Sequence, residues 1–373
     1  MRNITLFIFI AVLPALFTQC TRSSASEPAA AVQTTSVEAL KPLVVTEAVQ
    51  FDSDDPAIWI NRFDPANSLV VGTDKDVNGA LFVFDLNGKI VREKTVSGLQ
   101  RPDNVDIEYG LKIGGRDHDI AMLTERMTHK LRIYSMPTMQ PLDNGGIEVF
   151  EGETGDMYRD LMGIALYKNP ATGEVFAVVG RKQGPDGSYL WQYLLEDDGN
   201  GHIKATLARK FGKYSGKKEI ESIAVDDELG YVYYSDEGVG VHKYYADPKK
   251  GNEELALFAT INFAVDHEGI SIYTINDGTG YILVSDQGQN HFNVYPREGT
   301  EKGPHDHPLI KIIPASTQDS DGSEVSSVSF PGKFTSGLFV GMSADKTFQL
   351  YRWEDLAGKD LKIAPDGVPP LRK

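Results

Sequence analysis

Short apolar segments alternate with polar turns along most of this chain, and the pattern repeats about six times. In each copy an apolar alternation leads through a turn to a second apolar run, which ends in a cluster of polar residues. Alternation with a period of two and enrichment in Val, Ile, Tyr and Phe predict β-strands. The first alternations begin at Asp55, Asp103, Met162, Glu221, Glu268 and Ser326.

The repeat predicts an all-β fold, a six-bladed β-propeller, because a strand-rich unit of roughly 50 residues is typical of a propeller blade. Turn sequences at residues 85–88 and 197–200 separate apolar runs, as hairpins require. We expect Trp59, Trp191 and Trp353 to pack between blades. A β-sandwich with a second domain is the alternative, but it leaves the regular spacing of the copies unexplained.

The two ends of the chain differ in composition from the repeats. Residues 1–20 resemble an export leader, in which Arg2 precedes an apolar run that is short for a membrane span. Cys20, the only cysteine, follows this run and indicates a bacterial lipoprotein, with cleavage after Ala25 as the alternative. We therefore expect an exported protein, either an outer-membrane or periplasmic lipoprotein or a secreted one.

The composition also gives the expected domain boundaries. Residues 21–45 are rich in Ser, Ala, Thr, Pro and Glu and predict a flexible tether. The propeller is expected at residues 46–358, and residues 359–373 form a C-terminal extension. We expect a monomer whose only contact with a membrane is a lipid on Cys20.

The net charge of −16 over 373 residues narrows the range of partners. A strongly acidic protein repels nucleic acid and anionic membrane surfaces, so neither is expected as a partner. The same charge suits the binding of multivalent cations. No Gly-x-Ser-x-Gly motif is present, so a serine hydrolase is not supported.

Acidic residues cluster where the first strand of each copy begins. Equivalent positions of successive blades face one another around the axis, so the six starting residues given above form a ring in which four members are acidic. Like charges at this spacing raise one another's pKa values, and a hard cation with oxygen ligands removes the conflict. Solvated acids at strand ends are the alternative. The neighbouring carboxylates are Asp52, Asp54, Asp266, Asp319, Asp321 and Glu324.

A second set of polar residues follows the second strand of each copy. It consists of Lys75, Arg126, Lys182, Glu237 and Gln287, without a clear member in the sixth copy. Three consecutive blades thus offer cations beside the carboxylates. A phosphate ester needs this combination, because Lys and Arg bind phosphate oxygens while metals bridge phosphate and water. The alternative is that each cation pairs with a nearby acid.

The segment DSDDPAIW at residues 52–59 resembles the opening motif of the β-propeller phytases, the calcium-dependent alkaline phytases. Further matches keep the family's order along the chain and extend from about residue 50 to about residue 355. They are NVDI at 104–107, ESIAVDDE at 221–228, DHEGISIY at 266–273, SDQG at 285–288 and DG at 321–322 before GLFV at 337–340.

The resemblance implies a six-bladed fold, several calcium ions and a phosphate cleft at one end of the axis. In this chain Lys75, Arg126 and Lys182 match the family's phosphate-binding cations. The family's calcium-binding and water-activating residues are matched by Asp54, Asp55, Glu221, Glu237, Asp266, Glu268, Gln287 and Asp321. We add Asp103 and Asp319 as expected metal ligands from the acidic ring itself.

These matches predict a calcium-dependent phosphomonoesterase that hydrolyses phytate (myo-inositol hexakisphosphate) by metal-activated water. The expected catalytic residues are the three cations together with Asp55, Glu221 and Glu237. Gln287 is expected to contact the substrate as well as metal.

The chain departs from the family's pattern at three places. Asp76 stands where the family often has a second lysine, and Met162 stands where it has a tyrosine. The acidic loop around Asp319 and Asp321 is shorter than usual. These departures concern substrate preference and rate more than the class of reaction.

Two other functions remain as alternatives. One is a six-bladed calcium-dependent lactonase. Such an enzyme would need few cations at the end of the central channel, so Lys75, Arg126 and Lys182 argue against it. A non-enzymatic propeller that binds a ligand at the cell surface is the other. Phosphate release from phytate, with and without calcium, separates the three.

Overall fold

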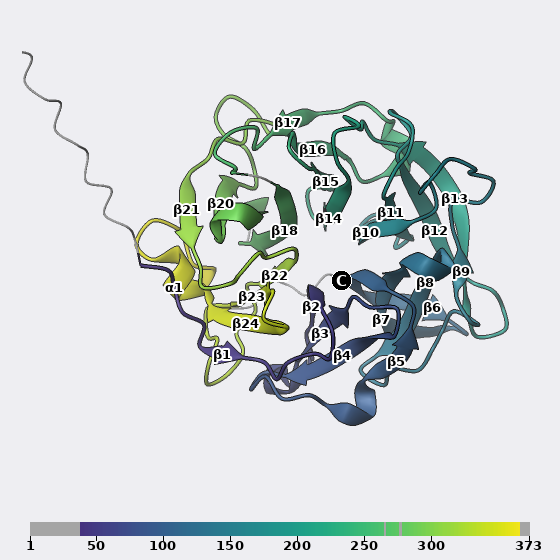
Figure 1. The fold of residues 1–373 in the computed structure, drawn as a ribbon, viewed down its shortest axis with the longest axis horizontal. Coiled ribbons are helices and arrows are strands. Elements are labelled where there is room, and N and C mark those ends of the chain that lie inside the picture. The colour runs from purple at the N-terminus through teal and green to yellow at the C-terminus, as the bar shows by residue number, and fades with distance from the viewer. Residues whose placement is uncertain (1–37, 265, 276–277, 366–373) are drawn as a thin grey trace, which may run out of the picture. The chain divides into compact units, whose positions relative to one another are not determined.

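The computed structural model describes residues 38–264, 266–275 and 278–365. Within this part of the chain the strands form six four-stranded antiparallel sheets around a common axis (Figure 1). This arrangement confirms the predicted six-bladed β-propeller. The expected leader and residues 21–37 of the expected tether lie outside the described residues. Among the residues that are described, no helix is long and apolar enough to cross a membrane.

Five sheets are built from consecutive strands, with the first strand of each nearest the axis. Their bounds are β2 (Ser53–Trp59), β3 (Leu69–Asp74), β4 (Gly79–Asp85) and β5 (Val96–Leu99); β6 (Pro102–Ile113), β7 (Arg116–Glu125), β8 (Lys130–Met136) and β9 (Ile147–Glu148); β10 (Leu161–Lys168), β11 (Val175–Arg181), β12 (Leu190–Asp197) and β13 (Ile203–Phe211); β14 (Ile220–Asp226), β15 (Tyr231–Asp236), β16 (Gly240–Tyr245) and β17 (Ala256–Phe258); and β18 (His267–Thr274), β19 (Gly280–Asp286), β20 (His291–Pro296) and β21 (Lys311–Pro314).

The sixth sheet joins strands from both ends of the described chain. It consists of β22 (Ser323–Ser326), β23 (Leu338–Ser343), β24 (Thr347–Arg352) and β1 (Val44–Val45). The helical segments are short: η1 (Pro65–Asn67), η2 (Arg92–Lys94), η3 (Arg126–Thr128), η4 (Pro248–Lys250), η6 (Gln287–Gln289) and α1 (Trp353–Ala357). Because β1 pairs with β24, the ring of blades is closed by hydrogen bonds between distant parts of the chain.

The described chain differs from the expected domain boundaries at both ends. Val44 pairs with Leu350 in β24, and Leu40 forms a bridge to Ala315, so these residues of the expected tether belong to the sixth blade. Leu361, in the expected C-terminal extension, is buried in the cluster that surrounds Trp353. The propeller therefore includes residues on both sides of 46–358.

The hydrophobic core lies between neighbouring blades. Six clusters of buried apolar side chains are found among the described residues, and each joins two successive blades. Trp59, Trp191 and Trp353 belong to three different clusters, which confirms that they pack between blades. The tight packing extends to the axis, where a Cβ atom added to Gly163 would lie 2.4 Å from the carbonyl oxygen of Glu221.

Candidate active site

A bulge at the start of the innermost strand turns one side chain toward the mouth of the axis in five of the six blades, and four of these five side chains are acidic. In β2, Ser53 pairs with Asp74 but Pro56 pairs with Gly72, so one extra residue is accommodated between the two pairs. The same shift occurs in β6, β10, β14 and β18. A β-bulge changes the direction of a side chain, which explains its use here. The first residues of the five bulges are Asp54, Asp103, Met162, Glu221 and Glu268.

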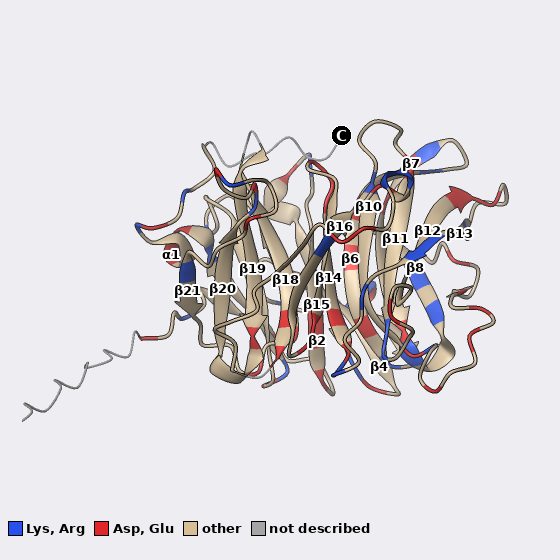
Figure 2. Ribbon diagram, turned by 90° about the horizontal axis from the view of Figure 1, so that it is seen from above, with Lys and Arg blue, Asp and Glu red and all other residues tan. Residues whose placement is uncertain are grey.

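The sixth blade supplies Asp321 at the equivalent position. Ser323 pairs with Gly341 as Pro56 pairs with Gly72, and Asp321 precedes Ser323 by two residues as Asp54 precedes Pro56. The ring therefore contains five carboxylates and one methionine. Figure 2 shows many Asp and Glu residues along the edge of the sheets where β2 begins.

The expected composition of this ring was wrong in two blades. Asp54 and Asp321 occupy the places that the sequence pattern gave to Asp55 and Ser326. Asp55 lies one residue deeper, where its Oδ2 atom accepts a hydrogen bond of 3.0 Å from the backbone N–H of Val105. The alternation of apolar and polar residues does not reveal the extra residue of a bulge. In the first blade, the residue expected in the ring was therefore wrong by one position.

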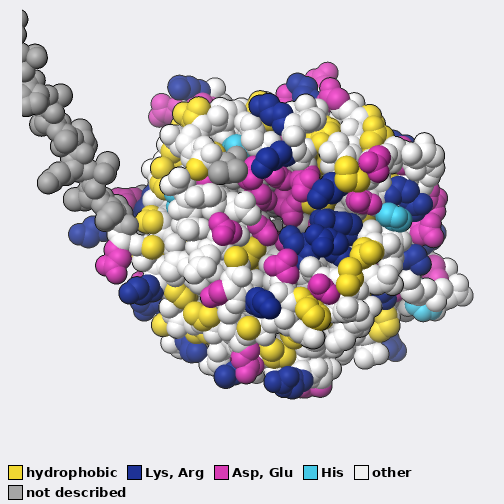
Figure 3. All heavy atoms as spheres, in the orientation of Figure 1, with side chains coloured by type: hydrophobic (Ala, Val, Ile, Leu, Met, Phe, Trp, Pro, Cys, Tyr) yellow, Lys and Arg dark blue, Asp and Glu magenta, His cyan; other side chains and the backbone are white. Residues whose placement is uncertain are grey.

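Three overlapping groups of carboxylates lie at the mouth. In each group, one oxygen from each carboxylate lies within 4.8 Å of the corresponding oxygens of the other two. The groups share Glu221 and Glu237, so they form one continuous series. Figure 3 shows acidic side chains gathered around the centre of this face. The groups are Asp54, Asp103 and Glu221; Glu219, Glu221 and Glu237; and Glu237, Asp266 and Glu268.

Burial makes ionisation of these carboxylates costly. Desolvation, reinforced by Asp103 and Asp321, raises the pKa of Asp54 to about 7 against the opposing effect of Lys75. Desolvation also raises the pKa of Glu237 to about 8, with further contributions from Glu219 and Asp266.

Glu221 and Glu268 are shifted in the same direction. Burial raises the pKa of both carboxyl groups well above the usual range, and neighbouring acids add to the effect. Perturbed pKa values in one cluster indicate a functional site.

Several carboxylate oxygens of the site are buried without a hydrogen-bond donor among the described residues. They are Oδ2 of Asp54, Oδ1 of Asp103 and Oε2 of Glu268. A buried acceptor without a partner is costly, and such oxygens are uncommon in folded proteins. A hard divalent cation takes several carboxylate oxygens in irregular geometry, which calcium in particular tolerates. The donor set therefore fits a calcium site.

Cations stand directly beside the carboxylates. Lys75, Arg126 and Lys182 each follow the last residue of the second strand in three consecutive blades, as the sequence pattern predicts. Glu237 and Gln287 follow the second strands of the next two blades. Figure 3 shows basic side chains next to the acidic ones on this face.

Each of the three cations pairs with a carboxylate of the groups. Lys75 forms an ion pair with Asp54, and its Nζ atom lies 3.5 Å from Asp321 and 3.9 Å from Glu221. Burial alone would lower the pKa of Lys75, but Asp54, Glu221, Asp103 and Asp321 outweigh it and raise the value well above the usual range.

Arg126 and Lys182 complete this set of pairs. Arg126 forms an ion pair with Asp103, and its Nε atom donates to the carbonyl of Leu161 at 3.0 Å. The Nζ atom of Lys182 lies 3.1 Å from Glu219. The N–H groups of these three cations therefore already bind carboxylates.

Of the other residues predicted for the site, Gln287 lies at the ring and Asp319 lies apart from the carboxylate groups. The Nε2 atom of Gln287 donates to Oδ1 of Asp321 at 2.5 Å, so this pair lies beside Lys75. Asp319 is exposed and belongs to none of the three groups; its backbone N–H donates to Asn290 at 2.9 Å. Lys218 was missed by the sequence reasoning, although its Nζ atom lies 2.5 Å from Asp266. It lies in a loop, where the repeat pattern carries no signal.

With this geometry established, the comparisons identify the family. The family model described as Phytase matches residues 5–363. The chain belongs to the phytase family. The 3-phytase of Bacillus subtilis (strain 168) is 28% identical over 324 residues, which cover 82% of this chain and 80% of that protein. A solved structure titled "Structure of Dos1 propeller" has a TM-score of 0.41 and 12% identity, covering 80% of this chain and 67% of that one.

Two departures from the phytase pattern have visible structural consequences. Met162 holds the third position of the ring, and its Sδ atom contacts Nη2 of Arg126. The ring of this phytase-family chain is therefore uncharged at its third position, and Asp103 at the second position is the ring carboxylate that pairs with Arg126. Asp76 does not extend the row of cations; its Oδ1 atom accepts from the backbone N–H of Asn78 at 2.9 Å and so stabilises the turn after β3.

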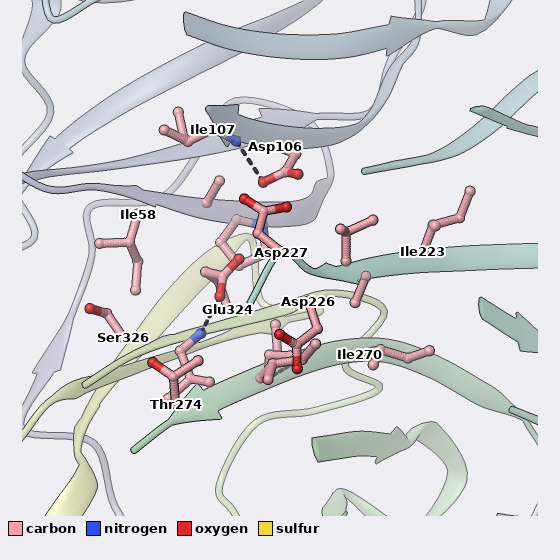
Figure 4. Close-up of a pocket in the computed structure, with 18 of the residues that line it drawn as sticks. Ile58, Asp106, Ile107, Ile223, Asp226, Asp227, Ile270, Thr274, Glu324 and Ser326 are labelled. Carbon is pink, nitrogen blue, oxygen red and sulfur yellow. Dashed lines mark hydrogen bonds between the residues drawn. The ribbon is translucent and has the colours of Figure 1, made fainter. Parts of the chain in front are cut away.

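A cavity runs along the axis behind the ring. It has a volume of about 840 Å³ and is lined by the innermost strands of all six blades. Figure 4 shows that Asp106, Asp226, Asp227 and Glu324 lie around it. Asp106 accepts from the backbone N–H of Leu166 at 2.7 Å, and so ties the second blade to the third. This use of an axial carboxylate supports the packing of the blades.

Proposed function

We propose that this member of the phytase family hydrolyses phytate to lower inositol phosphates and inorganic phosphate, with calcium as its metal. One observation carries the proposal: three cations stand against a continuous series of mostly buried carboxylates, and several oxygens of this series have no donor among the described residues. A substrate that carries several phosphates is complementary to the cations. A calcium ion is complementary to the carboxylates.

The three carboxylate groups would hold the metal, with Glu221 and Glu237 each shared by two groups. When bound, calcium would supply positive charge that polarises phosphate oxygens and lowers the pKa of the attacking water. The exposed Asp319 is left out of this assignment. Asp55 belongs to the axial side of the ring and is not assigned to the three groups.

The side chains of this chain have separable roles in the reaction. Arg126 presents a planar fork that matches two phosphate oxygens, whereas Lys75 and Lys182 act as point charges. These groups stabilise negative charge on phosphorus oxygens as water attacks and the bond to the inositol oxygen breaks. Glu237, which belongs to two of the three carboxylate groups, is placed to accept a proton from that water. The inositol oxygen takes up a proton as it leaves.

A cavity beside the ring supports a substrate with more than one phosphate. It has a volume of about 590 Å³ and extends from Arg126 and Lys182 to Arg101 and His129. A phosphate at the ring leaves Arg101 available to another phosphate on the same molecule. A lactone offers no charge to Arg101, Arg126 and Lys182, so the lactonase alternative is not favoured.

The test is phosphate release from phytate by the purified protein, with calcium and after chelation. We expect calcium-dependent release of phosphate, and its loss in Lys75→Ala. Hydrolysis of a lactone without phosphate release would replace this function with the alternative enzyme. Binding of phytate without any product would support the non-enzymatic function instead.

We also propose that the protein is exported and acts as a monomer, with a lipid on Cys20 as its only link to a membrane. Support comes from the apolar run that precedes Cys20 in the sequence. Metabolic labelling with palmitate, compared between the natural protein and Cys20→Ser, tests the lipid. Light scattering of the soluble domain tests the oligomeric state.

A further inference from the structure

Lys218 lies against the third group of carboxylates at the mouth. Its Nζ atom is 2.5 and 2.6 Å from the two carboxylate oxygens of Asp266 and 3.9 Å from Oε2 of Glu237. Asp266 and Glu237 belong with Glu268 to a group whose oxygens lie within 4.8 Å of one another. The ammonium therefore contacts oxygens that a divalent cation in this group needs.

The backbone of Lys218 is fixed beside this group. The hydroxyl of Tyr214 donates to the carbonyl of Lys218. Ser215 donates its backbone N–H at 2.8 Å and its hydroxyl at 2.7 Å to Asp236, which is buried and directly precedes Glu237. The loop that carries Lys218 is thus tied to the strand that leads to Glu237. The side chain itself is 47% exposed, so only its flexible stem limits its movement.

We propose that Lys218 is a built-in competitor of the metal at Glu237, Asp266 and Glu268. Its ammonium neutralises Asp266 while the group is empty, and a divalent cation displaces it on binding. The displacement follows from charge: an ammonium and a calcium ion repel each other and cannot share the same two oxygens. Lys218 therefore lowers the affinity of this group for calcium. This proposal rests on calcium as the metal of the proposed function.

The first test is calorimetric titration of calcium into the metal-free natural protein, Lys218→Met and Lys217→Met. Lys217 is the matched control, because it lies in the same loop but donates to the carbonyl of Gly238 at 3.2 Å instead of to a carboxylate. An exposed ion pair changes an equilibrium by up to about fivefold. We expect one calcium site of Lys218→Met to bind roughly two- to fivefold more tightly, and Lys217→Met to match the natural protein.

The second test follows the lysine directly in the natural protein, so it does not depend on how the variants fold. Amine acetylation is quantified by mass spectrometry at Lys218 and Lys217, with and without calcium. We expect calcium to increase acetylation of Lys218 while Lys217 stays constant. No increase at Lys218, despite confirmed calcium binding, overturns the proposal.

The two proposals fail in different ways. Equal calcium affinity in all three proteins, or weaker affinity in Lys218→Met, overturns the competition but leaves the calcium-dependent function standing. Absence of calcium binding in all three overturns the calcium assignment, and the competition with it.

Discussion

Lowering the pH from about 8 to about 6 should weaken calcium binding by the carboxylates at the mouth by at least about tenfold. The reason is that a carboxylate must lose its proton to bind metal, so protons and calcium compete for the same oxygens. With a pKa of about 7, Asp54 is largely ionised at the higher pH and largely protonated at the lower. The ionised fraction falls about tenfold, which corresponds to about 1.4 kcal/mol of binding free energy. Glu237, with a pKa of about 8, adds to the loss.

Calcium titration calorimetry at both pH values measures this effect. Repeating the titration in two buffers of different ionisation enthalpy counts the protons released as calcium binds. We expect about one or more protons to be released at the lower pH and fewer at the higher pH. Asp54→Asn serves as the comparison, because it removes one titrating ligand. An affinity that stays constant between the two pH values, without proton release, would refute the assignment of these buried acids as ligands.

Three further outcomes are expected. Chelation of calcium should lower the melting temperature, because a ligand at a hundredfold excess over its dissociation constant stabilises the native state by about 2.7 kcal/mol. An unchanged melting temperature after confirmed loss of the metal would contradict this. Arg126→Lys should recover only part of the phosphate turnover lost in Arg126→Ala, because Lys lacks the planar guanidinium that binds two phosphate oxygens. Equal turnover and Michaelis constant in Arg126→Lys and the natural protein would exclude bidentate phosphate binding by Arg126. Glu221→Gln should lower turnover by at least about a hundredfold and change the Michaelis constant much less, as assays with saturating phytate will measure. Near-normal turnover of this variant at low calcium would show that Glu221 has no role in the site.

The number of blades and the row of cations could be predicted from the sequence because both depend on strand order alone. Lys75, Arg126 and Lys182 each follow the end of a second strand, and a strand end is marked by where the apolar run stops. The alternation of the first strands gave the correct blades but not the correct register. A bulge adds one residue without changing composition, so Asp55 was expected where Asp54 lies.

Features that depend on distant contacts could not be predicted in the same way. Val44 pairs with Leu350 across most of the chain, and the short apolar segment around Val44 follows a stretch rich in small and polar residues that resembles a linker. Lys218 is brought to Asp266 by a loop that Tyr214 and Ser215 hold in place, and no repeat position marks it. Predicting these contacts requires the packing of one blade against the next.

We expect the pairing of charges at the mouth to link the binding of metal to the binding of phosphate. Lys75 is held by Asp54, Arg126 by Asp103, and Lys182 by Glu219. A phosphate needs the cations of these pairs, and a divalent cation needs the carboxylates. The first ligand to bind breaks these ion pairs. The second ligand then binds without the free-energy cost of breaking them, so its affinity is higher. Linkage is reciprocal, and calcium and phosphate should therefore strengthen each other's binding to the same degree.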